Sequence, residues 1–202
     1  MARTPKIVED RREQILDAAM RVFAEKGFAR TTNKDIAREA GITAGLIYHY
    51  FESKEAVFKA IIELRSPLSI IRSLPPEILA QPPAIFLPFL ARQVLGIVEG
   101  EPFIQILRMI LPEVIHNPEL TPVGRELIQT VSTFLASYFD AHMQEGKLRL
   151  TNPELVAQMF IGNIASFVLR RQILRDAAFL RYTHEQIATV VTEMMLQGLI
   201  PR

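Results

Sequence analysis

The chain has 202 residues, 49% hydrophobic and 22% charged, which is typical of an ordered globular protein and excludes a disordered one. It has no cysteine, which excludes a disulfide framework, a thiolate nucleophile and a cysteine-ligated metal. The net charge of +1 is too small to predict a nucleic-acid partner, so any such prediction must rest on the placement of particular residues.

The N-terminal segment, residues 1–14, lacks the apolar stretch of a signal peptide, so we expect a cytoplasmic protein. The longest nearly apolar runs, 84–91 and 160–169, are too short to cross a bilayer and are interrupted by Pro88 and Asn163. We therefore expect no membrane association.

Helical periodicity dominates the first 65 residues. Apolar residues three and four positions apart between 15 and 23 predict an amphipathic helix, and Gly27 suits its C-terminal end. Thr32 followed three residues later by Asp35 predicts the capped start of a short helix that Gly41 ends. Ser53 suits the N-cap of a helix over residues 54–65.

Five prolines between residues 66 and 83 break the helical pattern. We therefore predict a boundary there, between a domain over residues 9–65 and a domain over residues 66–202. Helix starts recur at Asn117, Asn152 and Thr183, and Gly198 and Pro201 are expected to close the last helix. Strand patterns are nearly absent, so the predicted fold class is all-α.

Residues 32–51 have the spacing of a helix-turn-helix motif. A small residue, Ala37, lets the second helix cross the first, and Gly41 supplies the backbone conformation of the turn. Three positions after the turn, Ile42, Ile47 and Tyr50, are expected to bury one side of the second helix.

The segment TTNKDIAREAGITAGLIYHYFESKEAVF, residues 31–58, preceded by REQILDAAMRVFAEKGF, resembles the TetR family of transcriptional regulators. The most specific part is Gly-x-x-Tyr-x-Tyr-Phe-x-Ser-Lys-Glu at 45–55, and PEVIHNPEL at 112–120 resembles AefR-type members. The resemblance implies a three-helix DNA-binding domain, a larger helical domain for ligand binding and dimerisation, and a dimer that binds double-stranded DNA at a palindromic operator.

The resemblance also implies that residues 43–50 form the recognition helix in the major groove. The residue types agree: Gly45 permits close approach, Leu46 suits a thymine methyl, and Lys54 in the next helix suits a phosphate. Thr43 as a cap only, and Tyr50 as a packing residue, remain alternatives. The predicted DNA contacts are Thr32, Asn33, Lys34, Thr43, Ala44, Gly45, Leu46, Tyr48, His49, Tyr50 and Lys54.

Two C-terminal segments, 153–174 and 186–200, are apolar on most sides of a helix. One side can face the core of the domain and the other a symmetric partner, so we expect a homodimer; the alternative is one large monomeric core.

The resemblance implies a pocket for a small, mainly apolar effector in the C-terminal domain. An ordinary core of aromatic residues would have the same pattern. The candidate lining residues are Phe86, Phe89, Phe103, Gln105, Arg108, Met109, Glu113, His116, Phe134, Tyr138, His142 and Asn163. Glu113 and His116 form a single Glu-x-x-His, whereas di-iron bundles need two, so no metal is expected.

We expect a ligand-responsive repressor without catalytic residues or cofactor. A helical-bundle enzyme is disfavoured because the sequence has no Ser/His/Asp arrangement, phosphate loop or paired metal motif. A protein-interaction adaptor that retains a helix-turn-helix remains open, since the net charge does not exclude it.

Overall fold

The structure is a computed structural model that describes residues 5–116 and 121–201, with side chains described for 10–109 and 124–201. Over these residues it is helical without any strand, which confirms the all-α prediction. Its internal contacts define two units: Met1–Ser66 with Glu101–Arg125, and Pro67–Gly100 with Glu126–Arg202. This grouping differs from the predicted continuous domain over 66–202, because the helix that begins at Glu101 packs against helices of the first unit.

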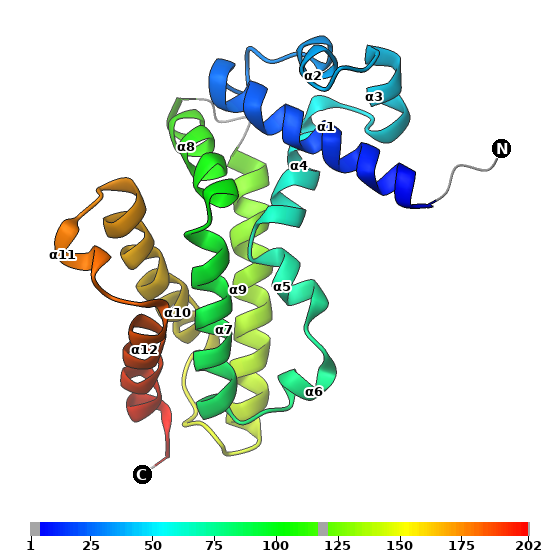
Figure 1. Cartoon of the computed structure of the whole chain (residues 1–202). Coiled ribbons are helices and arrows are strands. Elements are labelled where there is room, and N and C mark those ends of the chain that lie inside the picture. Colours follow the sequence, from blue (N-terminus) through cyan, green and yellow to red (C-terminus); the bar gives the residue numbers. More distant parts are fainter. Residues whose placement is uncertain (1–4, 117–120, 202) are drawn as a thin grey trace. The chain divides into compact units, whose positions relative to one another are not determined.

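Among its described residues the first unit contains five whole helices, at the blue, cyan and upper green parts of the chain in Figure 1, and the first residues of α9 (Thr121–Gln144). The five whole helices are α1 (Pro5–Lys26), α2 (Asn33–Glu39), α3 (Ala44–Tyr50), α4 (Lys54–Arg65) and α8 (Glu101–His116). Helix α1 packs against α2, α4 and α8, and α2 packs against α3. Three buried rings form the centre of this core: Phe28 lies 5.1 Å from Phe23 and 5.0 Å from Phe58 between ring centroids.

The predicted helix boundaries of the first unit are confirmed. The Thr32 hydroxyl accepts from the backbone N–H of Asp35, whose carboxylate accepts from the backbone N–H of Thr32, and the hydroxyl of Ser53 accepts from the N–H of Ala56. Gly27 and Gly41 have φ of 79° and 63°, the left-handed conformation that glycine adopts without strain.

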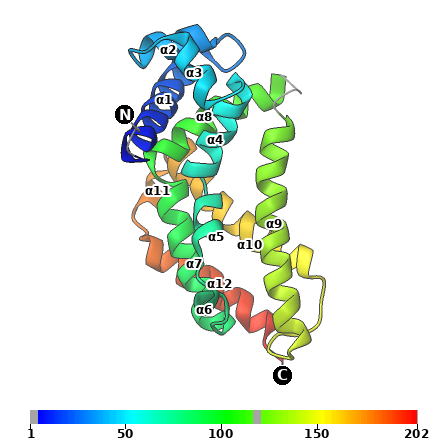
Figure 2. The same cartoon turned by 90° about the vertical axis from the view of Figure 1, so that its right-hand side faces the viewer.

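The second unit contains the remaining helices (Figure 1 and Figure 2). They are α5 (Leu68–Ser73), α6 (Pro76–Leu79), α7 (Pro83–Val98), most of α9 (Thr121–Gln144), α10 (Pro153–Val168), the π-helix η2 (Leu169–Ile173), α11 (Ala177–Leu180) and α12 (His184–Leu199). Helix α7 packs against α12 and α10, and α10 packs against α12.

Prolines and glycines punctuate this unit less strictly than the sequence predicts. The prolines from 67 to 83 leave two short helices, α5 and α6, between them, whereas Pro88 lies inside α7. The caps predicted at Asn152 and Thr183 are confirmed. The last helix, predicted to close at Gly198 and Pro201, ends between these two residues, because α12 continues through Gly198 to Leu199. The start predicted at Asn117 lies outside the described residues.

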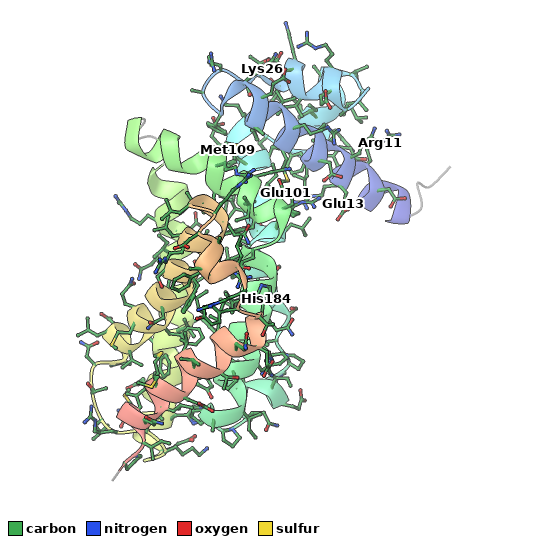
Figure 3. The ribbon with its side chains drawn as sticks, turned by 60° about the vertical axis from the view of Figure 1, so that its left-hand side comes forward. Arg11, Glu13, Lys26, Glu101, Met109 and His184 are labelled. Atoms are coloured by element: carbon green, nitrogen blue, oxygen red, sulfur yellow. The ribbon has the colours of Figure 1, made fainter. Side chains whose placement is uncertain are left out.

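A buried ion cluster ties three elements of the second unit together. Glu99, at the end of α7, lies 2.8 Å from Arg171 Nε of η2 and 2.9 Å from Nε2 of His184, the first residue of α12, which Figure 3 labels. The side chains of Glu99 and Arg171 are nearly inaccessible, so each charge depends on the other for compensation.

No single helix among the described residues is long and apolar enough to cross a membrane. One consecutive pair, Pro83–Val98 with Glu101–Met109, meets the length and composition criteria together, but only across a bend. Both helices of the pair carry many buried residues, as core helices do.

Candidate nucleic-acid interface

The turn between α2 and α3 is fixed by backbone hydrogen bonds around Gly41. The N–H of Ile42 donates to the carbonyl of Ala37 at 2.9 Å, and the N–H of Gly41 donates to the carbonyl of Arg38 at 3.2 Å. Ala37 is buried, as expected for a residue at the crossing of two helices. The turn therefore holds α3 at a set angle to α2, as in a helix-turn-helix.

Helix α3 has one buried side and one exposed side. Ile47 is completely buried, and Phe51, the residue that ends the helix, is nearly so. Tyr48 is 60% exposed although it is a large aromatic residue, and His49 is exposed beside it. Tyr50 is half-buried and its ring packs edge-on against that of His49 at 5.3 Å, so packing accounts for part of its role.

The start of α3 leaves polar and small groups uncommitted. Thr43 is the N-cap residue, yet its side chain makes no capping hydrogen bond and is exposed. Ala44 is half-buried, Leu46 is half-buried, and Gly45 is exposed. A Cβ added to Gly45 would meet no neighbouring atom within 4 Å, so the protein's own packing does not require glycine there.

The start of α2 supplies one free cation. Lys34 is exposed, and among the described residues it has no hydrogen-bond or ion-pair partner. The hydroxyl of Thr32 instead donates to Asp35 Oδ2 at 2.6 Å, and the amide oxygen of Asn33 is buried without a partner. The predicted phosphate contact is therefore better supported for Lys34 than for its two neighbours.

Lys54 has a structural role that the sequence analysis missed. Its ammonium donates to the carbonyls of Phe28 at 2.9 Å and Ala29 at 3.3 Å and lies 4.4 Å from the Phe28 ring centroid. These bonds tie the start of α4 to the loop after α1. A phosphate contact by Lys54 stays a prediction, and it would use the donor capacity that remains.

Asp35 and Gln14 are further residues that position the motif. The Lys26 ammonium, 2.7 Å from Asp35, and hydrogen bonds from Thr32 hold the pKa of the Asp35 carboxyl well below its usual range. Gln14 of α1 donates to the carbonyl of Ala40 at 2.7 Å, so α1 also supports the turn. The spacing of Thr32 and Asp35 in the sequence predicted the contact between these two residues, but nothing in the sequence indicated that Gln14 would bond to Ala40.

Some candidate effector-binding residues do meet in the second unit. The Tyr138 ring lies 4.4 Å from that of Phe86 and 4.5 Å from that of His142, and its hydroxyl donates to the carbonyl of Gln81 at 3.2 Å. Burial raises the pKa of the Tyr138 phenol and lowers the pKa of the His142 imidazole, because both charged forms would be desolvated. Phe89 and Phe134 are half-buried in the same unit.

The remaining candidates come from α8 of the first unit, from α10, and from residues without described side chains. Phe103, Gln105, Arg108 and Met109 belong to α8 in the first unit, where Gln105 and Arg108 face Glu101. The structure does not support Asn163 as a pocket residue, because it is exposed and its amide donates to the Met159 carbonyl of its own helix. The side chains of Glu113 and His116 lie outside the described residues.

Helices α10 and α12 are apolar on two opposite sides, as the sequence predicts. Their inner sides carry buried residues such as Phe160 and Val191. Their outer sides expose large apolar residues: Leu155, Met159, Val190 and Met194 are between 57% and 66% exposed. A helix of this kind fits burial against a second surface.

Two family profiles match the chain. Residues 15–61 match "Bacterial regulatory proteins, tetR family", and residues 86–198 match "AefR-like transcriptional repressor, C-terminal domain". The second match alone spans more than half of the chain. Together they contain both the helix-turn-helix and the helices with exposed apolar sides.

Individual relatives agree with these profiles. The regulator HbdR of Aromatoleum sp. (strain CIB) is 51% identical over 53 residues, which cover 26% of this chain and 23% of HbdR. The regulator UidR of Escherichia coli (strain K12) is 24% identical over 197 residues, covering 90% of this chain and 93% of UidR. The fold is similar to that of FadR from Bacillus subtilis, solved with stearoyl-CoA, with a TM-score of 0.73 and 22% identity over 92% of this chain and 98% of FadR.

The match to HbdR thus spans about a quarter of that protein, while the AefR-like profile covers residues 86–198 and UidR matches 90% of this chain. HbdR and UidR are both HTH-type transcriptional regulators. The helix-turn-helix geometry and the two profiles lead to one assignment: the chain belongs to the TetR family of DNA-binding transcriptional regulators and has an AefR-like C-terminal domain.

Proposed function

We propose that this protein is a repressor that binds a palindromic operator as a homodimer through α3 and releases it when a small, mainly apolar effector binds. One observation carries the DNA-binding part: the outer side of α3 combines an uncommitted Thr43, an open position at Gly45 and an exposed Tyr48. Because Gly45 has no side chain and Thr43 has no capping hydrogen bond, this side of α3 can approach the floor of the major groove closely.

The exposed apolar sides of α10 and α12 support the dimer. Leu155 and Met159 lie four residues apart on α10, and Val190 and Met194 lie four residues apart on α12, so each pair shares one face of its helix. The half-sites of a palindromic operator lie one helical turn, about 34–36 Å, apart, and a dimer with a two-fold axis presents one recognition helix to each of them.

The cluster of Phe86, Tyr138 and His142 supports an effector site in the second unit. It combines closely packed rings with two polar groups whose charged forms are disfavoured by burial. Such a lining suits an apolar ligand with one polar group. FadR of Bacillus subtilis was solved with stearoyl-CoA, so a long-chain acyl-CoA is the first effector to test: its acyl chain matches the apolar rings, and its charged CoA head group would have to lie outside the cluster.

Effector binding would act by population shift. A ligand that prefers the protomers in a spacing unlike that of two half-sites lowers the fraction competent to bind DNA. The ligand can do so only through the difference between its affinities for the two spacings.

The experiment selects DNA from a random duplex pool with the purified protein and titrates the selected duplex with salt. We expect a palindrome to be enriched and the affinity to fall steeply as salt rises, since phosphate contacts release counterions. Adding stearoyl-CoA should then dissociate the complex. Enrichment of no sequence, with no salt-sensitive binding, would refute the repressor and favour the protein-interaction adaptor.

A further inference from the structure

Most cations between residues 10 and 66 already have partners within the DNA-binding unit. Ion pairs with carboxylates are made by Arg21, Lys26, Arg38 and Arg65. Hydrogen bonds to backbone carbonyls are made by Arg30 and Lys54, and Arg11 donates to the amide oxygen of Gln14. Lys59 is also engaged. Among the side chains described in this range, Arg12 and Lys34 have neither a hydrogen-bond nor an ion-pair partner.

Arg12 belongs to α1, but its side chain lies beside the C-terminal end of α3. Its guanidinium carbon is 5.1 Å from the centroid of the Phe51 ring, and Phe51 is the residue that follows Tyr50 and ends the helix. Phe51 is buried and its N–H donates to the carbonyl of Ile47 at 2.8 Å, so the ring is fixed in position. The stacking therefore holds the Arg12 head group next to α3, although Arg12 belongs to α1.

We propose that Arg12 binds a backbone phosphate of the operator beside the C-terminal end of α3, and that stacking on Phe51 positions it for this contact. The inference rests on the proposed DNA-binding function and adds a contact from α1 to those of α2 and α3.

The chemistry of the guanidinium favours this role. The contact with the Phe51 ring uses none of its five N–H donors, and no described residue accepts a hydrogen bond from them. Two of them match two oxygens of a phosphate, a geometry that lysine does not reproduce. A phosphate is a better fit than a base, because residues beside a recognition helix reach the DNA backbone while the helix occupies the groove.

A purely internal role is the competing explanation. The last carbonyls of α3 carry partial negative charge, and a cation next to them is favourable without any DNA. The two explanations differ in salt dependence, since only a phosphate contact releases a counterion on binding.

The test compares full-length Arg12→Gln, Arg12→Lys and wild type with Arg11→Gln as the matched control. Arg11 is the neighbouring residue, labelled on α1 in Figure 3, and its partner is the amide of Gln14. Fluorescence anisotropy over a series of salt concentrations is measured on the selected operator duplex and on a scrambled duplex of equal length. Circular dichroism checks that each variant is folded.

We expect Arg12→Gln to weaken binding to both duplexes by the same factor and to flatten the plot of log affinity against log salt. With one contact per protomer, the slope on the operator should fall by about 1.8 for the dimer. Arg12→Lys should keep most of the slope but bind less tightly, because the charge remains and the paired donors of the guanidinium are lost. Arg11→Gln should match wild type.

An unchanged slope in a folded Arg12→Gln that binds less tightly would overturn the phosphate contact and leave the internal role. Equal effects of Arg11→Gln and Arg12→Gln would also overturn it, since net charge alone would then explain both. If wild type itself shows no salt-sensitive complex, the proposed function fails and this inference with it. A normal wild-type complex beside an unaffected Arg12→Gln rejects only the inference.

Discussion

Replacing Gly45 with alanine should stabilise the protein and weaken its binding to DNA. Gly45 lies in the first turn of α3, and an added Cβ would meet no neighbouring atom within 4 Å. The substitution therefore brings no internal clash and restricts the unfolded chain. We expect the free energy of unfolding to rise by about 0.5–1 kcal/mol.

The same methyl group should hinder the approach of α3 to the groove. If the backbone at Gly45 lies against the DNA, the added carbon must displace the helix outward or meet the DNA atoms. We expect operator affinity to fall about tenfold, which corresponds to ~1.4 kcal/mol. Stability and function would then change in opposite directions at one position.

Gly96→Ala is the matched control. Gly96 is an exposed glycine inside α7, and a Cβ added there also meets no neighbouring atom within 4 Å. It should give a similar stabilisation with unchanged DNA affinity. Urea unfolding followed by far-UV circular dichroism measures the first quantity, and fluorescence anisotropy with the operator duplex measures the second. A Gly45→Ala variant that binds DNA as tightly as Gly96→Ala would refute the close approach.

Three further predictions follow from charge and burial. Lys34→Ala should weaken binding to all DNA sequences alike and change the free energy of unfolding by less than about 0.5 kcal/mol. Lys54→Ala should lower the free energy of unfolding by about 1–3 kcal/mol, because two carbonyls lose their donor. Chemical denaturation measures both values, and equal stability of the two variants would contradict the role assigned to Lys54. Val190→Glu should give monomers in sedimentation experiments, while Ile128→Glu on α9 should leave the dimer intact, although both residues are 57% exposed. A Val190→Glu variant that stays dimeric would show that the interface lies elsewhere. Burial and the charge of Lys147 lower the pKa of His142 in the folded protein, so as the pH falls the imidazole is protonated in the unfolded chain before it is protonated in the folded one. The contribution of His142 to stability should therefore be complete above about pH 6.5 and decline as the pH falls below that value. In urea titrations at several pH values, His142→Gln should lose this part of the pH dependence.

The sequence alone determined the helices and their punctuation in the first 65 residues. Capping pairs and glycine turns depend on neighbours within a few positions, so Thr32 with Asp35, Ser53 and Gly41 could be recognised without a fold. The apolar spacing likewise separated the buried Ile47 from the exposed Tyr48, because a helix fixes which residues share a side.

Only the tertiary structure decided which side chains already have hydrogen-bond partners within the protein. Lys54 bonds to carbonyls 25 and 26 residues away and Gln14 to one 26 residues away, distances along the chain over which no local pattern operates. The same holds for α8, whose apolar side fits either unit by composition but packs on α1 and α4. Arg12 acquired a meaning in this way: in the sequence it is one of many cations, and in the fold it stacks on the residue that ends α3, because folding brings α1 against the helix-turn-helix.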